Sequence, residues 1–207
     1  MAKGKKYFSE TKFYPILFMI ILTIFFIGIL ATFHHLTAER ITRYQEEKLK
    51  REILNLFSIE IVDVNTDFER YISKESEAGL DYYVAYRDSL LGYCFPIAGQ
   101  GLWGTIEALL ALTPNLEHII NIAILEQNET PGLGGRITED WFLSQFSEKP
   151  IYEEGEIISY NLIPEGEPRR AQQVNQITGA TSSSRAVVRI LHENAKQILR
   201  TMGVDDE

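Results

Sequence analysis

Cysteine is nearly absent from this chain, which contains a single residue of this type, Cys94, among 207 residues. One cysteine excludes an internal disulfide and any zinc or iron–sulfur site built from cysteines. Positive charge is also scarce, because 20 Lys and Arg residues face 29 Asp and Glu residues, a net charge of -9. This balance argues against nucleic acid as the main partner.

Charge is missing altogether from residues 13–33, a run of 21 mostly apolar residues. A helix needs about 20 apolar residues to cross the hydrocarbon core of a bilayer, so the run predicts a transmembrane helix. The alternative is a cleaved signal peptide. The run is longer than a usual signal core and no small-x-small cleavage pattern follows it, which favours a retained anchor.

The charges beside this run bear on its orientation. Residues 1–33 contain four lysines and one glutamate, a net of +3, whereas the rest of the chain carries a net of -12. Lys and Arg also follow the run, so basic residues near the membrane show no clear bias. A short basic tail inside the cell is the simpler expectation, and it places the acidic remainder on the extracytoplasmic side.

Hydrophobic periodicity predicts a mixed α+β domain after the anchor. We expect helices at residues 39–57, 66–78, 138–147 and 182–202, and strands or extended segments at residues 80–87, 93–97, 105–113, 118–125 and 151–163. The sequence contains no internal repeat and no low-complexity linker. We therefore expect a basic tail (1–12), a transmembrane helix (13–33), a helical stalk and connector (34–78), and one domain with an antiparallel sheet and flanking helices (79–207).

Three short segments carry the residues that suggest chemistry: residues 100–105 (QGLWGT), 128–137 (NETPGLGGRI) and 175–185 (NQITGATSSSR). In the third, a small-residue turn leads into a helix whose first turn is rich in hydroxyls. One of these hydroxyls could be an ordinary N-cap. Alternatively, free N–H groups and the helix dipole could hold a phosphate there.

The other two segments are rich in glycine. Residues 128–137 lack the spacings of a nucleotide P-loop and of a dinucleotide-binding fold, and such a loop can be plain surface. Trp103 lies between glycines, either as a core aromatic at a bend or as a ring that packs on a planar ligand. No nucleophile, base and acid can be assembled from the sequence.

Together, the three segments resemble the FMN-binding domain of the C and G subunits of the Nqr and Rnf ion-translocating electron-transport complexes. Residues 178–181 match the family's [S/T]-G-A-T flavinylation motif, and residues 129–134 match its E-T-P-G-L-G loop. Residues 101–103 resemble the G-L-W of the Nqr-type C subunit. The resemblance covers the anchor and most of the domain from residue 80.

The resemblance implies a covalent flavin. The hydroxyl of Thr181 would be esterified to the phosphate of FMN by a separate flavin transferase that uses FAD and a divalent metal. The chain would then relay electrons in the cell membrane beside other Rnf/Nqr-type subunits, without catalytic residues or a metal site of its own. The cofactor-binding residues implied are Trp103, Glu129, Thr130, Leu133, Gly134, Thr178, Gly179, Ala180, Thr181, Ser182 and Ser183.

One position departs from the family pattern. The residue three before the motif is usually Asp, whereas this chain has Asn175, which keeps the shape and removes the charge. We expect slower flavinylation from this change. Two alternatives stay open: a flavinylated domain that serves another extracytoplasmic reductase, and an anchored sensor or assembly protein without redox function.

Overall fold

The computed structural model describes residues 13–153, 155–167, 170 and 172–204, so the expected basic tail lies outside the described residues. The chain divides into two compact units, residues 1–46 and residues 47–207. The second unit contains every strand found among the described residues.

Helix α1 (Tyr14–Leu56) supplies the described structure of the first unit and enters the second. It is the one helix among the described residues that is long and apolar enough to cross a membrane, by length and composition. Its apolar side chains from Tyr14 to Phe33 are largely exposed. The Thr32 hydroxyl donates to the carbonyl of Gly28 at 2.8 Å, so this polar group is satisfied within the helix.

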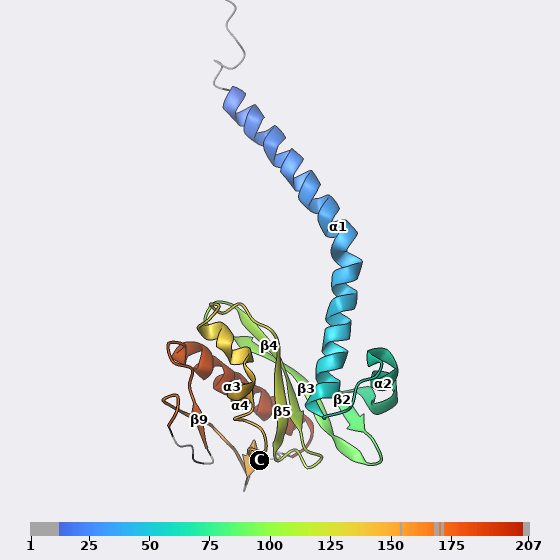
Figure 1. Ribbon diagram of the computed structural model, residues 1–207, viewed down its shortest axis with the longest axis vertical. Helices are drawn as coiled ribbons and strands as arrows, with labels where there is room; N and C mark the ends of the chain where they lie inside the picture. Colours follow the sequence, from blue (N-terminus) through green and yellow to red (C-terminus); the bar gives the residue numbers. More distant parts are fainter. Residues whose placement is uncertain (1–12, 154, 168–169, 171, 205–207) are drawn as a thin grey trace, which may run out of the picture. The chain divides into compact units, whose positions relative to one another are not determined.

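The second unit is built on a five-stranded antiparallel sheet whose strands follow sequence order (Figure 1). The strands are β1 (Ile72–Glu77), β2 (Leu80–Tyr86), β3 (Leu90–Gln100), β4 (Thr105–Leu112) and β5 (Ile119–Glu126). Neighbouring strands are joined by short connections, as is usual for antiparallel pairs. The long central pair β3–β4 ends at the bend that carries Trp103, because Gln100 pairs with Thr105.

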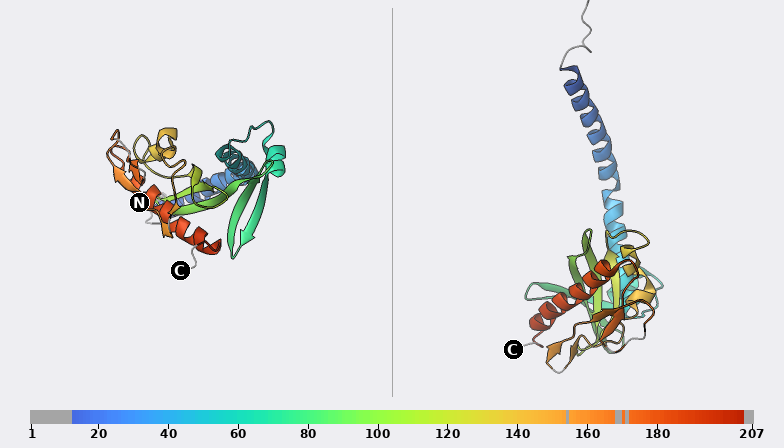
Figure 2. Two further views of the ribbon diagram at one scale, coloured as in Figure 1. Left: turned by 90° about the horizontal axis from the view of Figure 1, so that it is seen from below. Right: turned by 90° about the vertical axis from the view of Figure 1, so that its left-hand side faces the viewer.

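Each face of this sheet is covered by a helix. Helix α4 (Thr181–Thr201) packs on the face formed by alternate β4 residues such as Ile106 and Leu110. The opposite face, which includes Leu109 and Ala111, packs against the last turns of α1. The two-residue period of a strand explains this division of β4 side chains between two cores. Figure 2 shows α4 running along one side of the sheet.

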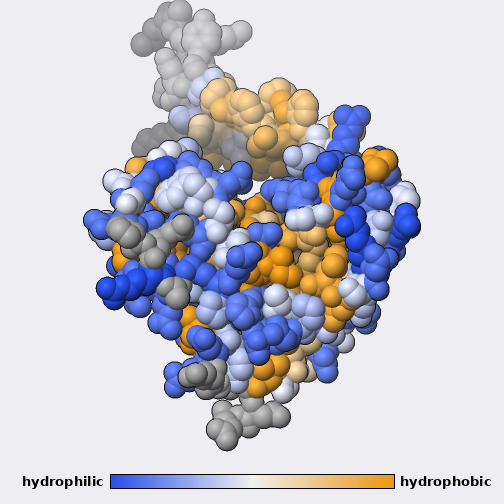
Figure 3. Space-filling model, turned by 60° about the horizontal axis from the view of Figure 1, so that its bottom comes forward, coloured by the Kyte–Doolittle hydropathy of each residue, from blue (hydrophilic) through white to orange (hydrophobic). Residues whose placement is uncertain are grey.

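Short elements complete the unit. Helix α2 (Val64–Tyr71) precedes the sheet, and a 3-10 helix η2 (Gly134–Thr138) and a short α3 (Asp140–Leu143) follow it. Four short strands connect α3 to α4: β6 (Tyr152–Glu153), β7 (Glu156–Ile157), β8 (Asn161–Ile163) and β9 (Gln173–Asn175), of which β8 and β9 pair in parallel. Polar side chains cover most of the face seen in Figure 3, and apolar side chains gather in a hollow near its middle.

The structure confirms the α+β class and the antiparallel sheet, and it corrects two predicted helices. The helix expected at 66–78 ends at Tyr71, because Ile72 is extended and begins β1, which pairs with β2. The helix expected at 138–147 is divided into η2, α3 and a series of turns. In the first place long-range pairing with β2 overrides the local preference, and in the second the chain stays in short helical turns instead of one continuous helix.

Candidate functional site

Thr181 is the first residue of α4 and is half-buried. The turn before it places Gly179 at a φ of +78°, a conformation that glycine adopts without strain. Ala180 occupies the N-cap position, and no side chain caps this end of the helix. The hydroxyl of Thr181 is therefore not the N-cap, and the first N–H groups of α4 lack the acceptors that a helix interior would offer.

The serines after Thr181 divide into one exposed and two buried residues. Ser182 is exposed, whereas Ser183 and Ser184 are buried. The Ser184 Oγ accepts from the N–H of Ile177 at 3.0 Å and donates to the carbonyl of Ala180 at 3.1 Å. The hydroxyl of Ser184 thus holds the turn that precedes Thr181.

Glu129 connects the three segments that stood out in the sequence. Its side chain is buried, with the residue 4% exposed. One carboxylate oxygen, Oε2, accepts from the Ser183 hydroxyl at 2.6 Å. The other, Oε1, accepts from the backbone N–H groups of Leu102 at 2.7 Å and Trp103 at 3.2 Å. One carboxylate therefore fastens the tryptophan bend and the glycine-rich loop to the first turn of α4.

Glycine is required where these segments meet. A Cβ on Gly101 would lie 2.4 Å from the Glu129 Oε1, and a Cβ on Gly134 would lie 2.4 Å from the Ser183 Oγ. Both distances are far below a van der Waals contact. The glycines of the G-L-W bend and of the E-T-P-G-L-G loop therefore allow the carboxylate to reach its donors.

Three exposed apolar side chains belong to the bend and the loop that Glu129 joins. Leu102, Trp103 and Leu133 are 55%, 70% and 46% exposed. A Cβ added to Gly179 would lie 3.1 Å from the Leu133 Cδ2, so Leu133 lies beside the turn that leads to Thr181. Because Trp103 is exposed, it is not a core aromatic, and its contact with a planar ligand stays a prediction.

Thr130 and Thr178 shape the backbone around this group, and both residues are exposed. The carbonyl of Thr130 accepts from the N–H groups of Leu133 at 3.1 Å and Gly135 at 3.0 Å, which closes the glycine-rich loop. The N–H of Thr178 donates to the Glu165 Oε2 at 2.8 Å. That hydrogen bond, with help from the side chain of Thr178 and from Arg136, lowers the pKa of Glu165 below its usual value.

Asn175 is buried and uses the donors that distinguish it from Asp. Its Nδ2 donates to the carbonyls of Pro164 at 2.8 Å and Glu167 at 3.0 Å. Its backbone N–H donates to the Gln145 Oε1 at 2.8 Å, and the Gln145 Nε2 donates back to its carbonyl at 3.2 Å. Asn175 thus fixes residues 164–167, the loop whose Glu165 holds Thr178.

Gln145 and Glu165 are absent from the candidate residues that the sequence provided. Gln145 lies 30 positions before its partner Asn175, and Glu165 lies 13 positions before Thr178, so no local motif links them.

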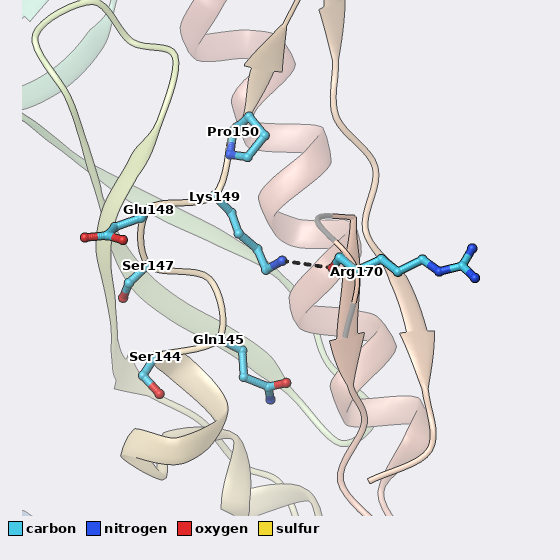
Figure 4. A pocket seen from close by; sticks show the side chains of 7 residues that line it. All are labelled: Ser144, Gln145, Ser147, Glu148, Lys149, Pro150 and Arg170. Atoms are coloured by element: carbon cyan, nitrogen blue, oxygen red, sulfur yellow. Dashed lines mark hydrogen bonds between the residues drawn. The ribbon is translucent and has the colours of Figure 1, made fainter. Parts of the chain in front are cut away.

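Gln145 also lines an open pocket of about 430 Å³ with Ser144, Ser147, Glu148, Lys149, Pro150 and Arg170. In Figure 4 the guanidinium of Arg170 points away from the other labelled side chains. None of the three segments lines this pocket.

Comparison with known proteins identifies the domain that carries this site. Residues 101–196 match the FMN-binding domain family. The chain is 30% identical over 117 residues to the C subunit of the Na(+)-translocating NADH-quinone reductase of Vibrio vulnificus, covering 56% of this chain and 46% of that protein. It is 31% identical over 124 residues to the G subunit of the proton-translocating ferredoxin:NAD(+) oxidoreductase complex of Clostridium ljungdahlii, covering 59% of this chain and 62% of that protein.

Two solved structures share the fold. The crystal structure of the C subunit of the Na(+)-translocating NADH-quinone reductase from Parabacteroides distasonis has a TM-score of 0.65 and 24% identity, over 80% of this chain and 96% of that chain. The NqrC structure from Shewanella oneidensis has a TM-score of 0.63 and 18% identity, over 72% and 91%. The chain spans about half the length of the curated Nqr relatives it matches. Residues 101–196 therefore resemble the FMN-binding domain family, and the resemblance to the C subunit of Nqr and the G subunit of Rnf is confirmed.

Proposed function

We propose that this chain is a membrane-anchored flavoprotein subunit of an Rnf/Nqr-type ion-translocating complex, with FMN held by a phosphoester to Thr181. When bound, FMN supplies the electron-carrying chemistry that the side chains lack. The observation that supports this best is the position of Thr181, which lies at the uncapped start of a 21-residue helix. A phosphodiester keeps a negative charge, and a helix N-terminus favours an anion at that place.

The surroundings of Thr181 fit both halves of FMN. The first-turn N–H groups and the exposed Ser182 hydroxyl offer donors to the phosphate. Leu102, Trp103 and Leu133 offer exposed apolar surface to the isoalloxazine ring. The hydroxyl of Ser183 is already donated to Glu129, so its part is to hold the loops rather than the phosphate.

Attachment requires a second enzyme, which the resemblance implies is a flavin transferase acting on FAD. The Thr181 Oγ would form a bond to the phosphorus of the FMN half of FAD. The pyrophosphate bond to that phosphorus would break, AMP would leave, and the hydroxyl proton would be released. The oxidation state of the flavin does not change in this step, so no oxidant or reductant is needed.

Flavin fluorescence in a denaturing gel tests the attachment. The full chain is expressed with and without a flavin transferase and examined under ultraviolet light after electrophoresis. We expect a fluorescent band that Thr181→Val abolishes. Thr201→Val makes the same change at the other end of α4 and should keep the band. Fluorescence that survives Thr181→Val would sink the assignment.

The same protein tests the proposed partners. Recovery of the tagged chain with polytopic membrane subunits favours a place in an Rnf/Nqr-type complex. Recovery with a single soluble reductase would replace that complex with the alternative reductase system.

Orientation in the membrane can be tested with one introduced thiol. The only natural cysteine, Cys94, is buried, and burial raises the pKa of its thiol. A membrane-impermeant maleimide applied to intact spheroplasts should therefore label Ser89→Cys, at an exposed turn, and leave the parent chain unlabelled. Labelling of Ser89→Cys only after cell lysis would reverse the proposed orientation.

A further inference from the structure

The carboxylate of Glu129 has hydrogen-bond donors at both oxygens, and all three come from the segments that would surround the flavin. Moving a carboxylate out of water is costly unless donors replace the lost hydration. Two backbone N–H groups and one hydroxyl fill that role here. Each of these hydrogen bonds also holds one segment of the chain in place, so the buried carboxylate fixes the local structure.

We propose that Glu129 is a positioning residue for the flavin, and that its charge lowers the reduction potential of the FMN on Thr181. This inference rests on the proposed function, and it assigns Glu129 a role behind the ligand surface. Because Glu129 is 4% exposed and its oxygens are engaged, Glu129 supports the residues that would touch FMN. Leu102 and Trp103 are those residues on one side, and the first turn of α4 is the other.

The glycines show how closely this arrangement depends on the carboxylate. Gly101 and Gly134 approach Glu129 so closely that a Cβ on either would lie within 2.8 Å of a carboxylate oxygen. The carboxylate therefore fills the space between the bend and the loop. Removing it would leave two backbone N–H groups without their acceptor and a gap between the segments, so the bend at Trp103 would keep its own Gly101–Gly104 bond and lose its attachment to the loop.

Glutamine can separate the shape of Glu129 from its charge. In Glu129→Gln, the amide oxygen can keep the N–H groups of Leu102 and Trp103. The amide NH₂ can donate to the Ser183 Oγ, because a hydroxyl is able to accept as well as donate. The bend should therefore stay in place while a buried negative charge disappears. In Glu129→Ala both are lost.

Amide hydrogen exchange tests the positioning role without any flavin. The full chain in detergent is compared with Glu129→Ala and Glu129→Gln, and mass spectrometry follows peptides that contain Leu102 and Trp103. We expect exchange at these amides at least about tenfold faster in Glu129→Ala and close to the parent rate in Glu129→Gln. Protection of Cys94 from a thiol reagent checks that each variant is folded. Unchanged exchange in folded Glu129→Ala would overturn the positioning role. Ser183→Ala keeps both N–H bonds and should show little change at these amides, so it is the control. If Glu129→Ala does not fold, Glu129→Asp takes its place, because a carboxylate that is one methylene shorter is drawn away from these N–H groups and faster exchange is again expected.

Redox titration of the flavinylated chain tests the role of the charge. A nearby negative charge opposes the uptake of an electron, so Glu129→Gln should move the flavin potential to a more positive value. Glu60→Gln removes the same charge from an exposed residue and should leave the potential at the parent value. Equal potentials in Glu129→Gln and the parent would overturn this role.

The proposed function and the role of Glu129 can fail separately. A parent chain that acquires no fluorescent flavin would end the proposed function, and the exchange measurement would still decide whether Glu129 holds the bend. A parent chain that carries flavin, with unchanged exchange in Glu129→Ala and unchanged potential in Glu129→Gln, would keep the proposed function and remove this inference.

Discussion

The two faces of the sheet are packed in different ways. The core between the sheet and the end of α1 contains only hydrophobic buried side chains among the described residues, including Leu109 and Cys94. The polar side chains that are buried lie on the side of α4 or in the loops beside it: Glu129, Gln145, Asn175, Ser183 and Ser184.

The two faces therefore have different roles: one stabilises the domain, and the other positions the candidate site. Apolar packing is not directional and tolerates small shifts, so it suits the face that only has to hold the domain together. Buried hydrogen bonds fix distances and angles, so they suit the face that has to present Thr181 next to Trp103. A polar framework with every partner in place also makes substitution costly, since each lost partner leaves a buried group unsatisfied.

The largest expected effect comes from neighbouring leucines on β4 that point to opposite faces. Leu109 and Leu110 are both fully buried, in different cores. Leu109→Ala and Leu110→Ala should each lower the free energy of unfolding by about 3 kcal/mol, measured by chemical denaturation. Cys94 shares the core of Leu109, so its labelling by a thiol reagent should rise more in Leu109→Ala. The reverse order of labelling would contradict this assignment of faces.

A smaller loss of stability is expected when a negative charge is introduced among the buried polar side chains. Asn175→Asp replaces an amide that donates to the carbonyls of Pro164 and Glu167 with a carboxylate that repels both. We expect a loss of about 2 kcal/mol in unfolding free energy at neutral pH. Asn161→Asp makes the same change at an exposed residue of β8 and should cost little.

The same variant decides between two views of the family motif. The family motif usually has Asp at position 175, so it favours faster flavinylation in Asn175→Asp. The hydrogen bonds lead to the opposite expectation, because Asn175 holds the loop that fixes Thr178. A stable Asn175→Asp chain that gains flavin faster than the parent would show that the charge matters more than the loop.

Much of the fold could be predicted because it depends on periodicity. The α4 helix is predicted at 182–202 and runs Thr181–Thr201, and every end of the predicted β4–β5 pair lies within one residue of the observed end. The strand at Ile72–Glu77 was mistaken for a helix, since its four exposed polar residues follow no strand pattern and its pairing with β2 alone defines it. Local propensity cannot reveal such a pairing.

The candidate site, like the fold, could be predicted only in part. The three motifs point to Thr181, Trp103 and Glu129, but not to the hydrogen bonds between the segments. Glu129 stands 26 and 27 positions from its backbone donors and 54 from Ser183, so only the folded chain shows that it joins all three. The serine run suggested donors for a phosphate, and the structure divides it into an exposed Ser182 and two internal hydroxyls.

That division of the serines predicts a modest difference in stability. Ser184→Ala removes the acceptor of the buried Ile177 N–H, so it should lower the unfolding free energy by about 1.5 kcal/mol. Ser182→Ala removes an exposed hydroxyl from the same helical turn and should change it by less than about 0.5 kcal/mol. Equal losses in the two variants would show that the Ser184 hydroxyl does not hold the turn before Thr181.

The smallest expected effect lies at the edge of the polar framework, where Glu165 is exposed to water. The N–H of Thr178 is the main cause of its lowered pKa. A carboxyl whose pKa is lower in the folded chain than in the unfolded chain stabilises the fold above its unfolded pKa, and that contribution is lost as pH falls through the folded pKa. The thermal midpoint of the parent should therefore fall slightly more than that of Glu165→Gln between about pH 5 and about pH 3. Glu167→Gln removes a charge from the same loop and leaves the carboxylate that accepts from Thr178 ionisable, so its midpoint should follow the parent. If Glu165→Gln also follows the parent, the charge of Glu165 does not contribute to stability through its bond to Thr178.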